Sequence, residues 1–165
     1  MLYIIMPRPA GGVSCSEIYI SLRTLPLHGD LTEKVMKLLR DNTFMNLATS
    51  YNDNPRSSIM EYVMVGDSLI FSTDPNSIKG KNLAKNPKVS LTVGNMPVFM
   101  AIDGTVTDVT AKEKEEYNKV LIKRYPQLKD VLGTDDMVFK YFRVTFKTAY
   151  YSEGMGPAEV IKMGK

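Results

Sequence analysis

Short apolar segments separated by turn residues fill the chain between residues 44 and 94, and this pattern most constrains the fold. Residues 52–55 read Asn-Asp-Asn-Pro, a cluster of residue types that tolerate tight backbone geometry. Gly66 and Asp67 separate the next two segments, and glycine supplies the positive φ that a two-residue hairpin needs. Strands joined by hairpins pair antiparallel, whereas parallel strands need long crossover connections. The stretch therefore predicts an antiparallel sheet.

The same reading extends along the chain. We predict strands over residues 44–50, 56–65, 68–73, 88–93, 98–109, 137–151 and 159–163, and helices over 30–42, 77–86 and from Thr110 to Pro126. Thr110 and Glu113 have the spacing of a capping box. Gly104, inside a long strand, predicts a bulge or bend of the kind that barrel corners require.

The longest predicted strand, residues 137–151, has two distinct faces. Its core face is expected to carry Val138, Phe142, Val144 and Phe146 with the stem of Lys140. Its second face is expected to carry Phe139, Tyr141, Arg143 and Tyr151, and this mixed face would suit a subunit interface.

The tally of six or seven strands and three helices predicts a mainly β fold, an antiparallel barrel with peripheral helices rather than a doubly wound sheet. A chain of 165 residues is long enough for one domain with a real core. Residues 1–29 match no periodic pattern, so we expect an N-terminal extension followed by a single domain over residues 30–165.

Composition argues against several classes of protein. The net charge of +3 and the absence of basic runs longer than two residues argue against nucleic-acid binding, although a mild positive balance suits a small anionic ligand. No apolar run approaches the roughly 20 residues of a membrane span. With one cysteine, Cys15, and one histidine, His28, a single chain forms no disulfide and no Cys/His zinc cage. We expect no metal site and a cytoplasmic location.

Polar residues on the predicted strand 56–65 suggest an anion site. Alternate strand residues share a face, so Arg56, Ser58 and Met60 are expected to point the same way. Arg56 offers a forked and permanently charged donor, and Ser58 places a hydroxyl beside it. Such a pair suits a phosphate group.

The next strand and helix add candidates to this site. Ser72 and Thr73 supply two hydroxyls where the strand ends, and Ser77 begins a helix whose free N–H groups favour an anion. Lys79 and Lys81 add positive charge in the first turns. On composition alone, a solvated basic helix beside an ordinary hairpin is the simpler interpretation.

Three segments carry a resemblance to a known superfamily: LATSYNDNPRSSIMEYVM, LIFSTDPNSIKGKNLAKNPKVSLTV and FMAIDGTVTDVT. In the second, an aromatic residue and Ser-Thr end a strand, and Ser-x-Lys, Asn-Leu and Asn-Pro-x-Val-Ser-Leu follow. Over residues 44–108 the chain resembles the pyridoxamine 5′-phosphate oxidase-like, FMN-binding split-barrel superfamily. The rest of the chain agrees with it only in the order of elements.

The resemblance implies a six-stranded antiparallel Greek-key split barrel that forms a homodimer with FMN at the subunit interface. It implies phosphate-binding roles for Arg56 and Lys79, and a helix start at Ser77, where Ile78 replaces a frequent arginine and Lys81 is expected to substitute. It places the other candidates on the strand under the flavin and at the end of its neighbour: Ser57, Ser58, Ile59, Met60 and Glu61, then Ser72 and Thr73.

Departures from the family pattern argue against a true pyridoxamine 5′-phosphate oxidase. The oxidase proper has a lysine where Glu61 stands and a glutamine where Phe99 falls, and its late Arg-x-His element has no counterpart in KTAYYSEGMG. The heme-binding members need an axial ligand, for which His28 is a poor candidate. We expect no partner beyond a second copy and a small-molecule substrate or electron donor.

Three functions remain open at this point. The first is an FMN oxidoreductase that passes hydride or electrons to or from a small molecule. The second is a non-catalytic FMN carrier or sensor, and the third is a deazaflavin-dependent reductase on the same barrel. The aromatic residues Tyr62, Phe99, Tyr150 and Tyr151 are candidates for a substrate slot, with ordinary barrel packing as the alternative for each.

Overall fold

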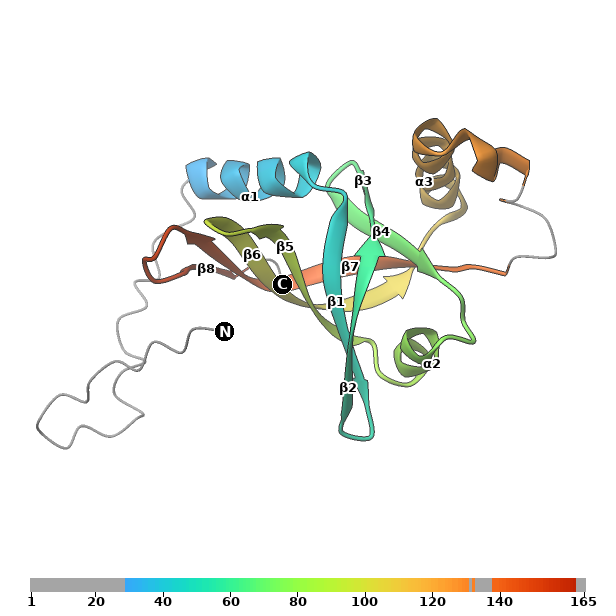
Figure 1. The fold of residues 1–165 in the computed structure, drawn as a ribbon, viewed down its shortest axis with the longest axis horizontal. Helices are drawn as coiled ribbons and strands as arrows, with labels where there is room; N and C mark the ends of the chain where they lie inside the picture. Colours follow the sequence, from blue (N-terminus) through green and yellow to red (C-terminus); the bar gives the residue numbers. More distant parts are fainter. Residues whose placement is uncertain (1–28, 131, 133–137, 163–165) are drawn as a thin grey trace, which may run out of the picture.

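The computed structural model describes residues 29–130, 132 and 138–162 (Figure 1). The helices are α1 (Gly29–Asp41), α2 (Ile78–Lys85) and α3 (Ala111–Arg124), followed by the short 3-10 helix η1 (Pro126–Asp130). The strands are β1 (Phe44–Tyr51), β2 (Asn54–Glu61), β3 (Val63–Val65), β4 (Ser68–Thr73), β5 (Lys88–Asn95), β6 (Val98–Asp108), β7 (Lys140–Glu153) and β8 (Glu159–Lys162). The extension predicted over 1–29 lies outside the described residues, except that Gly29 begins α1.

One antiparallel sheet connects all of these strands. Its order is β2-β1-β5-β6-β7-β4-β3, and β8 pairs with β7 beside this path. The two ends of the path, β2 and β3, are separated in the sequence only by Tyr62. The sheet therefore curls on itself through one continuous segment, and the predicted mainly β split barrel is confirmed. The structure has eight strands rather than the seven predicted segments because the predicted strand 56–65 divides at Tyr62 into β2 and β3. The short strand predicted over 159–163 is present as β8.

The main core fills the inside of the curled sheet. α1 packs against it through Val35 and Leu39, both 0% exposed, and Figure 1 shows this helix lying across one end of the curled sheet, beside β5 and β6. Inward residues of five strands supply much of the rest of the core: Met45, Leu47, Leu69, Phe71, Leu91, Val93, Met100, Ile102, Phe142 and Val144.

A second, smaller core lies outside the barrel under α3. Tyr117 of this helix packs edge-on against Tyr141, with ring centroids 5.5 Å apart, and Arg143 Nη1 donates to Glu113 Oε1 at 2.9 Å. The capping box predicted for Thr110 and Glu113 is confirmed. Because α3 covers Tyr141 and Arg143, the prediction that this face of β7 suits a subunit interface is wrong.

A β-bulge interrupts the pairing of β6 with β7. The register shifts between Asp103 and Gly104, and Lys147 is left without a partner residue, as the glycine predicted. A Cβ at Gly104 would lie 2.5 Å from the Thr145 carbonyl oxygen, so no larger residue fits there. The extra residue reverses the alternation of β7, and Tyr151 faces the core. The expectation that Tyr151 shares a face with Tyr141 assumed strict alternation and is wrong.

The start of the last long strand also differs from the prediction. β7 begins at Lys140 rather than at residue 137, and Val138 is 70% exposed. Val138 therefore lies before the strand and outside the core, and Lys140 is exposed rather than packed by its stem. None of the helices in the described ranges is long and apolar enough to cross a membrane.

Candidate functional site

The edge strand β2 carries the first group of candidates. Within the described part of the chain it pairs only with β1, so one row of its backbone N–H and C=O groups has no strand partner. Arg56 lies opposite Thr49 in this pairing, and Thr49 is buried on the barrel side. Ser58 and Met60 alternate with Arg56 and share its face, as predicted.

The other candidates on β2 lie on the opposite, outer face. Ser57 and Ile59 are exposed there, Ile59 to 76%. Glu61 shares this face at the end of the strand, where its Oε1 accepts a hydrogen bond from Arg124 Nη1 at 2.9 Å. The same nitrogen donates to the Tyr62 carbonyl oxygen at 3.2 Å. The carboxylate of Glu61 is therefore engaged with α3 and points away from Arg56.

A buried hydrogen bond places α2 beside this strand. Asn82 Nδ2 donates to Thr49 Oγ1 at 3.2 Å, and both side chains are less than a tenth exposed. Lys79 precedes Asn82 by three residues, so the two share a helix face. Thr49 is also the register partner of Arg56. The hydrogen bond between Asn82 and Thr49 therefore places the helix face that carries Lys79 next to the strand position of Arg56. Figure 1 shows α2 beside the β1–β2 hairpin.

The N-terminus of α2 is built by tight backbone contacts. Ser77 caps the helix: its hydroxyl accepts from the Gly80 N–H at 3.1 Å and donates to the Asp74 carbonyl oxygen at 2.6 Å. The hydroxyl of Thr73 lies 3.3 Å from that of Ser77. The first intrahelical bond runs from the Lys81 N–H to the Ser77 carbonyl oxygen. Because the Gly80 N–H is taken by the Ser77 hydroxyl, the N–H groups of Ile78 and Lys79 are the ones left to face an anion.

Ser72 and Thr73 point in different directions. The Ser72 hydroxyl lies 3.1 Å from the Tyr117 hydroxyl under α3, and burial raises the pKa of Tyr117. Thr73 turns toward Ser77 instead. Successive residues of a strand face opposite sides, so the structure does not bring the two hydroxyls together as a pair.

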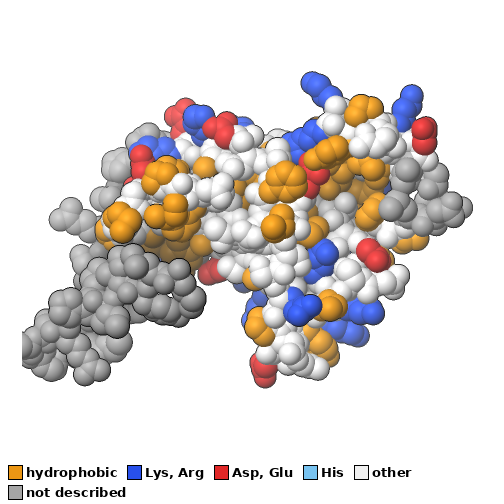
Figure 2. Space-filling model, in the orientation of Figure 1, with side chains coloured by type: hydrophobic (Ala, Val, Ile, Leu, Met, Phe, Trp, Pro, Cys, Tyr) orange, Lys and Arg blue, Asp and Glu red, His pale blue; other side chains and the backbone are white. Residues whose placement is uncertain are grey.

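Positive charge remains available around α2 and β2. Among the described residues, Arg56, Lys79 and Lys81 take part in no ion pair. Figure 2 shows Lys and Arg side chains gathered over β2 and α2. Lys81 is exposed, whereas Lys79 is half-buried.

Two of the four aromatic slot candidates belong to the barrel core. Tyr62 is 1% exposed and donates its hydroxyl hydrogen to the Leu39 carbonyl oxygen at 2.8 Å; its burial raises its pKa well above the ordinary range. Tyr151 is 5% exposed within the main core. Ordinary packing is the correct interpretation for both. Phe99 and Tyr150 lie on the outer face of the sheet, half-buried and 37% exposed respectively.

Sequence reasoning missed Asn82 and Thr49 as positioning residues. The one signal was an asparagine in a helix interior, where its helix propensity is poor. Its partner lies 33 residues away on β1, and only the folded chain shows that the two meet.

Fold and site together define a curled antiparallel split barrel with a cluster of cationic side chains, Arg56, Lys79 and Lys81, near an edge strand. Residues 31–153, most of the chain, match the family described as pyridoxamine 5′-phosphate oxidase. The chain therefore belongs to the pyridoxamine 5′-phosphate oxidase family, and the resemblance inferred from its sequence is confirmed.

Known proteins illustrate the family's range. A pyridoxine/pyridoxamine 5′-phosphate oxidase from Acidothermus cellulolyticus is 36% identical over 93 residues, which are 53% of this chain and 40% of that protein. The chain thus spans about two fifths of that relative.

Two solved structures share the fold at low identity. A heme-binding protein from Mycobacterium smegmatis superposes with a TM-score of 0.67 and 16% identity over 79% of this chain and 57% of its own. An FAD-binding protein from Mesorhizobium loti gives 0.56 and 18% over 72% of this chain and 89% of its own.

Proposed function

We propose that this chain binds FMN and acts as an oxidoreductase that passes hydride or electrons between the flavin and a small molecule. The observation that carries the proposal is the corner where the free edge of β2 meets the first turn of α2. Family membership supports a flavin as the cofactor. FMN is preferred because its single phosphate suits one compact cluster of cations and N–H groups.

Arg56 and Lys79 would hold the phosphate. The guanidinium of Arg56 presents two parallel donors to phosphate oxygens, and Lys79 adds a single-point contact. The unbonded N–H groups at the start of α2 form the positive end of the helix dipole, which attracts an anion. The hydrogen bond between Asn82 and Thr49 keeps these parts in register before a ligand arrives.

The free edge of β2 would hold the ring. A flavin carries an N–H donor and carbonyl acceptors along its pyrimidine side, and the unpaired N–H and C=O groups over residues 57–61 offer the complementary pattern. When bound, FMN supplies the hydride or electron chemistry. The chain's own part is to bind the phosphate, orient the ring and exclude water from one face.

A second copy of the chain would cover the other face of the ring. Phe44 and Ile59 stand on neighbouring strands of the outer face, 53% and 76% exposed, and no helix of the described part packs over them. Figure 2 shows hydrophobic side chains on this side of β1 and β2. Burying such groups favours association. A homodimer is therefore part of the proposal, and sedimentation velocity checks it.

The test compares FMN affinity in Arg56→Ala with that of the parent chain. Loss of a charge-assisted phosphate contact costs about 1.5–3 kcal/mol, which weakens the affinity roughly 10- to 150-fold. Lys129→Ala, an exposed lysine on η1, is the matched control and should leave the affinity unchanged. Equal affinity in folded Arg56→Ala and parent would remove Arg56 from the site.

Turnover separates the enzyme from its alternatives. Consumption of a reduced nicotinamide with FMN bound supports the oxidoreductase, whereas bound FMN without turnover with any donor indicates a carrier or sensor. A chain that ignores FMN but binds a deazaflavin indicates the third function. A Soret band on added heme, without flavin binding, would overturn the flavin assignment altogether.

A further inference from the structure

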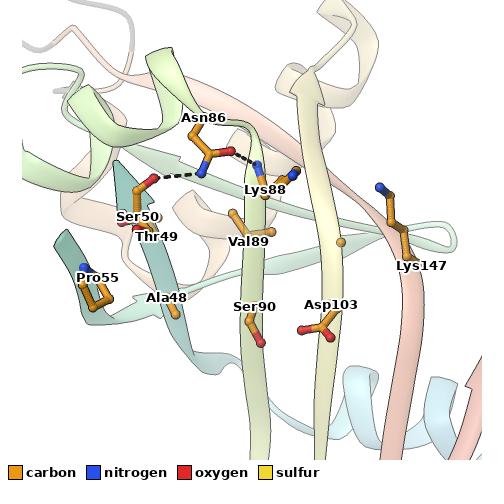
Figure 3. Close-up of a pocket in the computed structure, with 11 residues that line it drawn as sticks. Ala48, Thr49, Ser50, Pro55, Asn86, Lys88, Val89, Ser90, Asp103 and Lys147 are labelled. Atoms are coloured by element: carbon orange, nitrogen blue, oxygen red, sulfur yellow. Dashed lines mark hydrogen bonds between the residues drawn. The ribbon is translucent and has the colours of Figure 1, made fainter. Parts of the chain in front are cut away.

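A hollow lies on the outer face of the sheet, at the opposite end of α2 from Ser77 (Figure 3). Its volume is about 380 Å³, within the range of about 300–1,000 Å³ typical of small-molecule sites. Strands β1, β5, β6 and β7, the start of β2 at Pro55 and the turn after α2 form its walls. Arg56 and Lys79, which are assigned to the flavin phosphate, do not line it, although Thr49 and Pro55, the neighbour of Arg56, do.

Two lysines form one end of this hollow. Lys88 starts β5, and its neighbour Val89 is buried in the core, so Lys88 faces outward. Lys147 is the extra residue of the β-bulge, and bulges redirect side chains in this way. The two lie on strands that flank β6, so their backbones are at least two strand spacings, about 10 Å, apart. Lys147 is also two residues along β7 from Thr145, which shares a row with Lys88. Figure 3 shows both amino groups raised at the same end of the hollow.

The other end of the hollow offers acceptors. Ser90 and Asp103 are register partners on β5 and β6, and Figure 3 shows their side chains next to each other. Within the part of the chain that the structure describes, none of Asp103, Lys88 and Lys147 forms an ion pair. Two cations and one carboxylate are therefore all available to a ligand.

The wall nearest α2 is fixed in advance. Asn86 Nδ2 donates to the Ser50 carbonyl oxygen at 2.9 Å, and the Lys88 N–H donates to Asn86 Oδ1 at 3.1 Å. One side chain thus ties the end of β1 to the start of β5. Because this wall is already ordered, a ligand does not have to immobilise it, and the entropic cost of binding is lower.

We propose that this hollow binds a small zwitterion whose anionic group contacts Lys88 and Lys147 and whose ammonium group contacts Asp103. The geometry requires a compact molecule with opposite charges at its two ends. The three charged residues of the hollow are not among those assigned to FMN, so its occupancy should not depend on FMN.

O-phospho-L-serine is a suitable probe because it carries both charges. In the ¹⁵N-labelled full chain, its titration should shift the amide resonances of Ser90, Gly104 and Lys147 in a saturable way. Lys147→Met keeps the aliphatic stem and should weaken binding by about 1.4- to fivefold, as expected for a solvent-exposed charge pair. Asp103→Asn should weaken O-phospho-L-serine but not inorganic phosphate. Lys129→Met is the matched control and should bind like the parent chain.

Absence of saturable shifts in these three amides would overturn the proposal. Equal affinity in Lys147→Met and the parent would do the same. Shifts confined to Ser77 and Lys79 would mean that the probe reads the start of α2 instead. Binding at the hollow should persist unchanged in Arg56→Ala, so failure of the flavin proposal and failure of this one give different results.

Discussion

Removing the hydrogen bond between Asn82 and Thr49 should lower the free energy of unfolding more than changing an exposed residue of α2 does. Asn82→Ala leaves the Thr49 hydroxyl, 3% exposed, without the amide that bonds it at 3.2 Å. An unsatisfied buried polar group costs about 1–3 kcal/mol. The same change loosens the helix face that carries Lys79, so FMN affinity should fall together with stability.

A double-mutant cycle separates the bond from the side chains. Thr49→Val alone leaves the Asn82 amide without its partner and should lower the free energy of unfolding by a similar amount. The double variant Thr49→Val with Asn82→Leu replaces both polar partners by apolar groups, so its loss should be smaller than the sum of the two single losses. Urea unfolding measures each step, because a midpoint that falls at constant slope reports a change in stability alone. Lys85→Ala, exposed on the same helix, is the control. Additive effects, or an unchanged midpoint in Asn82→Ala, would refute the reasoning.

Two further predictions concern the frame around the site. Gly104→Ala should lower the melting temperature, since its Cβ would meet the Thr145 carbonyl oxygen at 2.5 Å, whereas Gly156→Ala has open space and should not; equal melting temperatures would contradict the strained bulge. Hydrogen bonds from the Thr110 N–H and hydroxyl, with Arg143, lower the pKa of Glu113. This stabilisation is complete above the unfolded-state pKa and is lost as pH falls through the folded-state value. Glu113→Gln should therefore flatten the acid limb of a stability-versus-pH curve; an unchanged slope would count against it.

Local signals in the sequence carry much of the fold. Turn residues at 52–55 and at Gly66 mark the hairpins, Gly104 marks the bulge, and the Thr110 capping box marks the start of α3, each within a few residues of the chain. The effect of the bulge on β7 could not be predicted, because Gly104 marks the bulge on β6 but nothing in the sequence marks Lys147 as the extra residue on β7. Every β7 side chain after that residue therefore faces the side opposite to the one that strict alternation predicts. The exposure of Val138 escaped prediction because alternation was extended beyond the end of the strand.

The candidate site shows the same division. Arg56, Ser58 and Met60 share a face by strand periodicity alone, and the chain's own pattern predicts it. The partner of Ser72 is Tyr117, 45 residues away, and the partner of Glu61 is Arg124, 63 residues away. Contacts at such separations depend on where α3 packs, which no local pattern in the sequence specifies.

The most direct test of the central claim is a visible absorption titration of the purified chain with FMN, read together with its mass in solution. The account predicts a perturbed flavin spectrum that saturates at one FMN per chain, on a particle of twice the chain mass. A spectrum identical to that of free FMN, with no bound flavin after gel filtration, would contradict it.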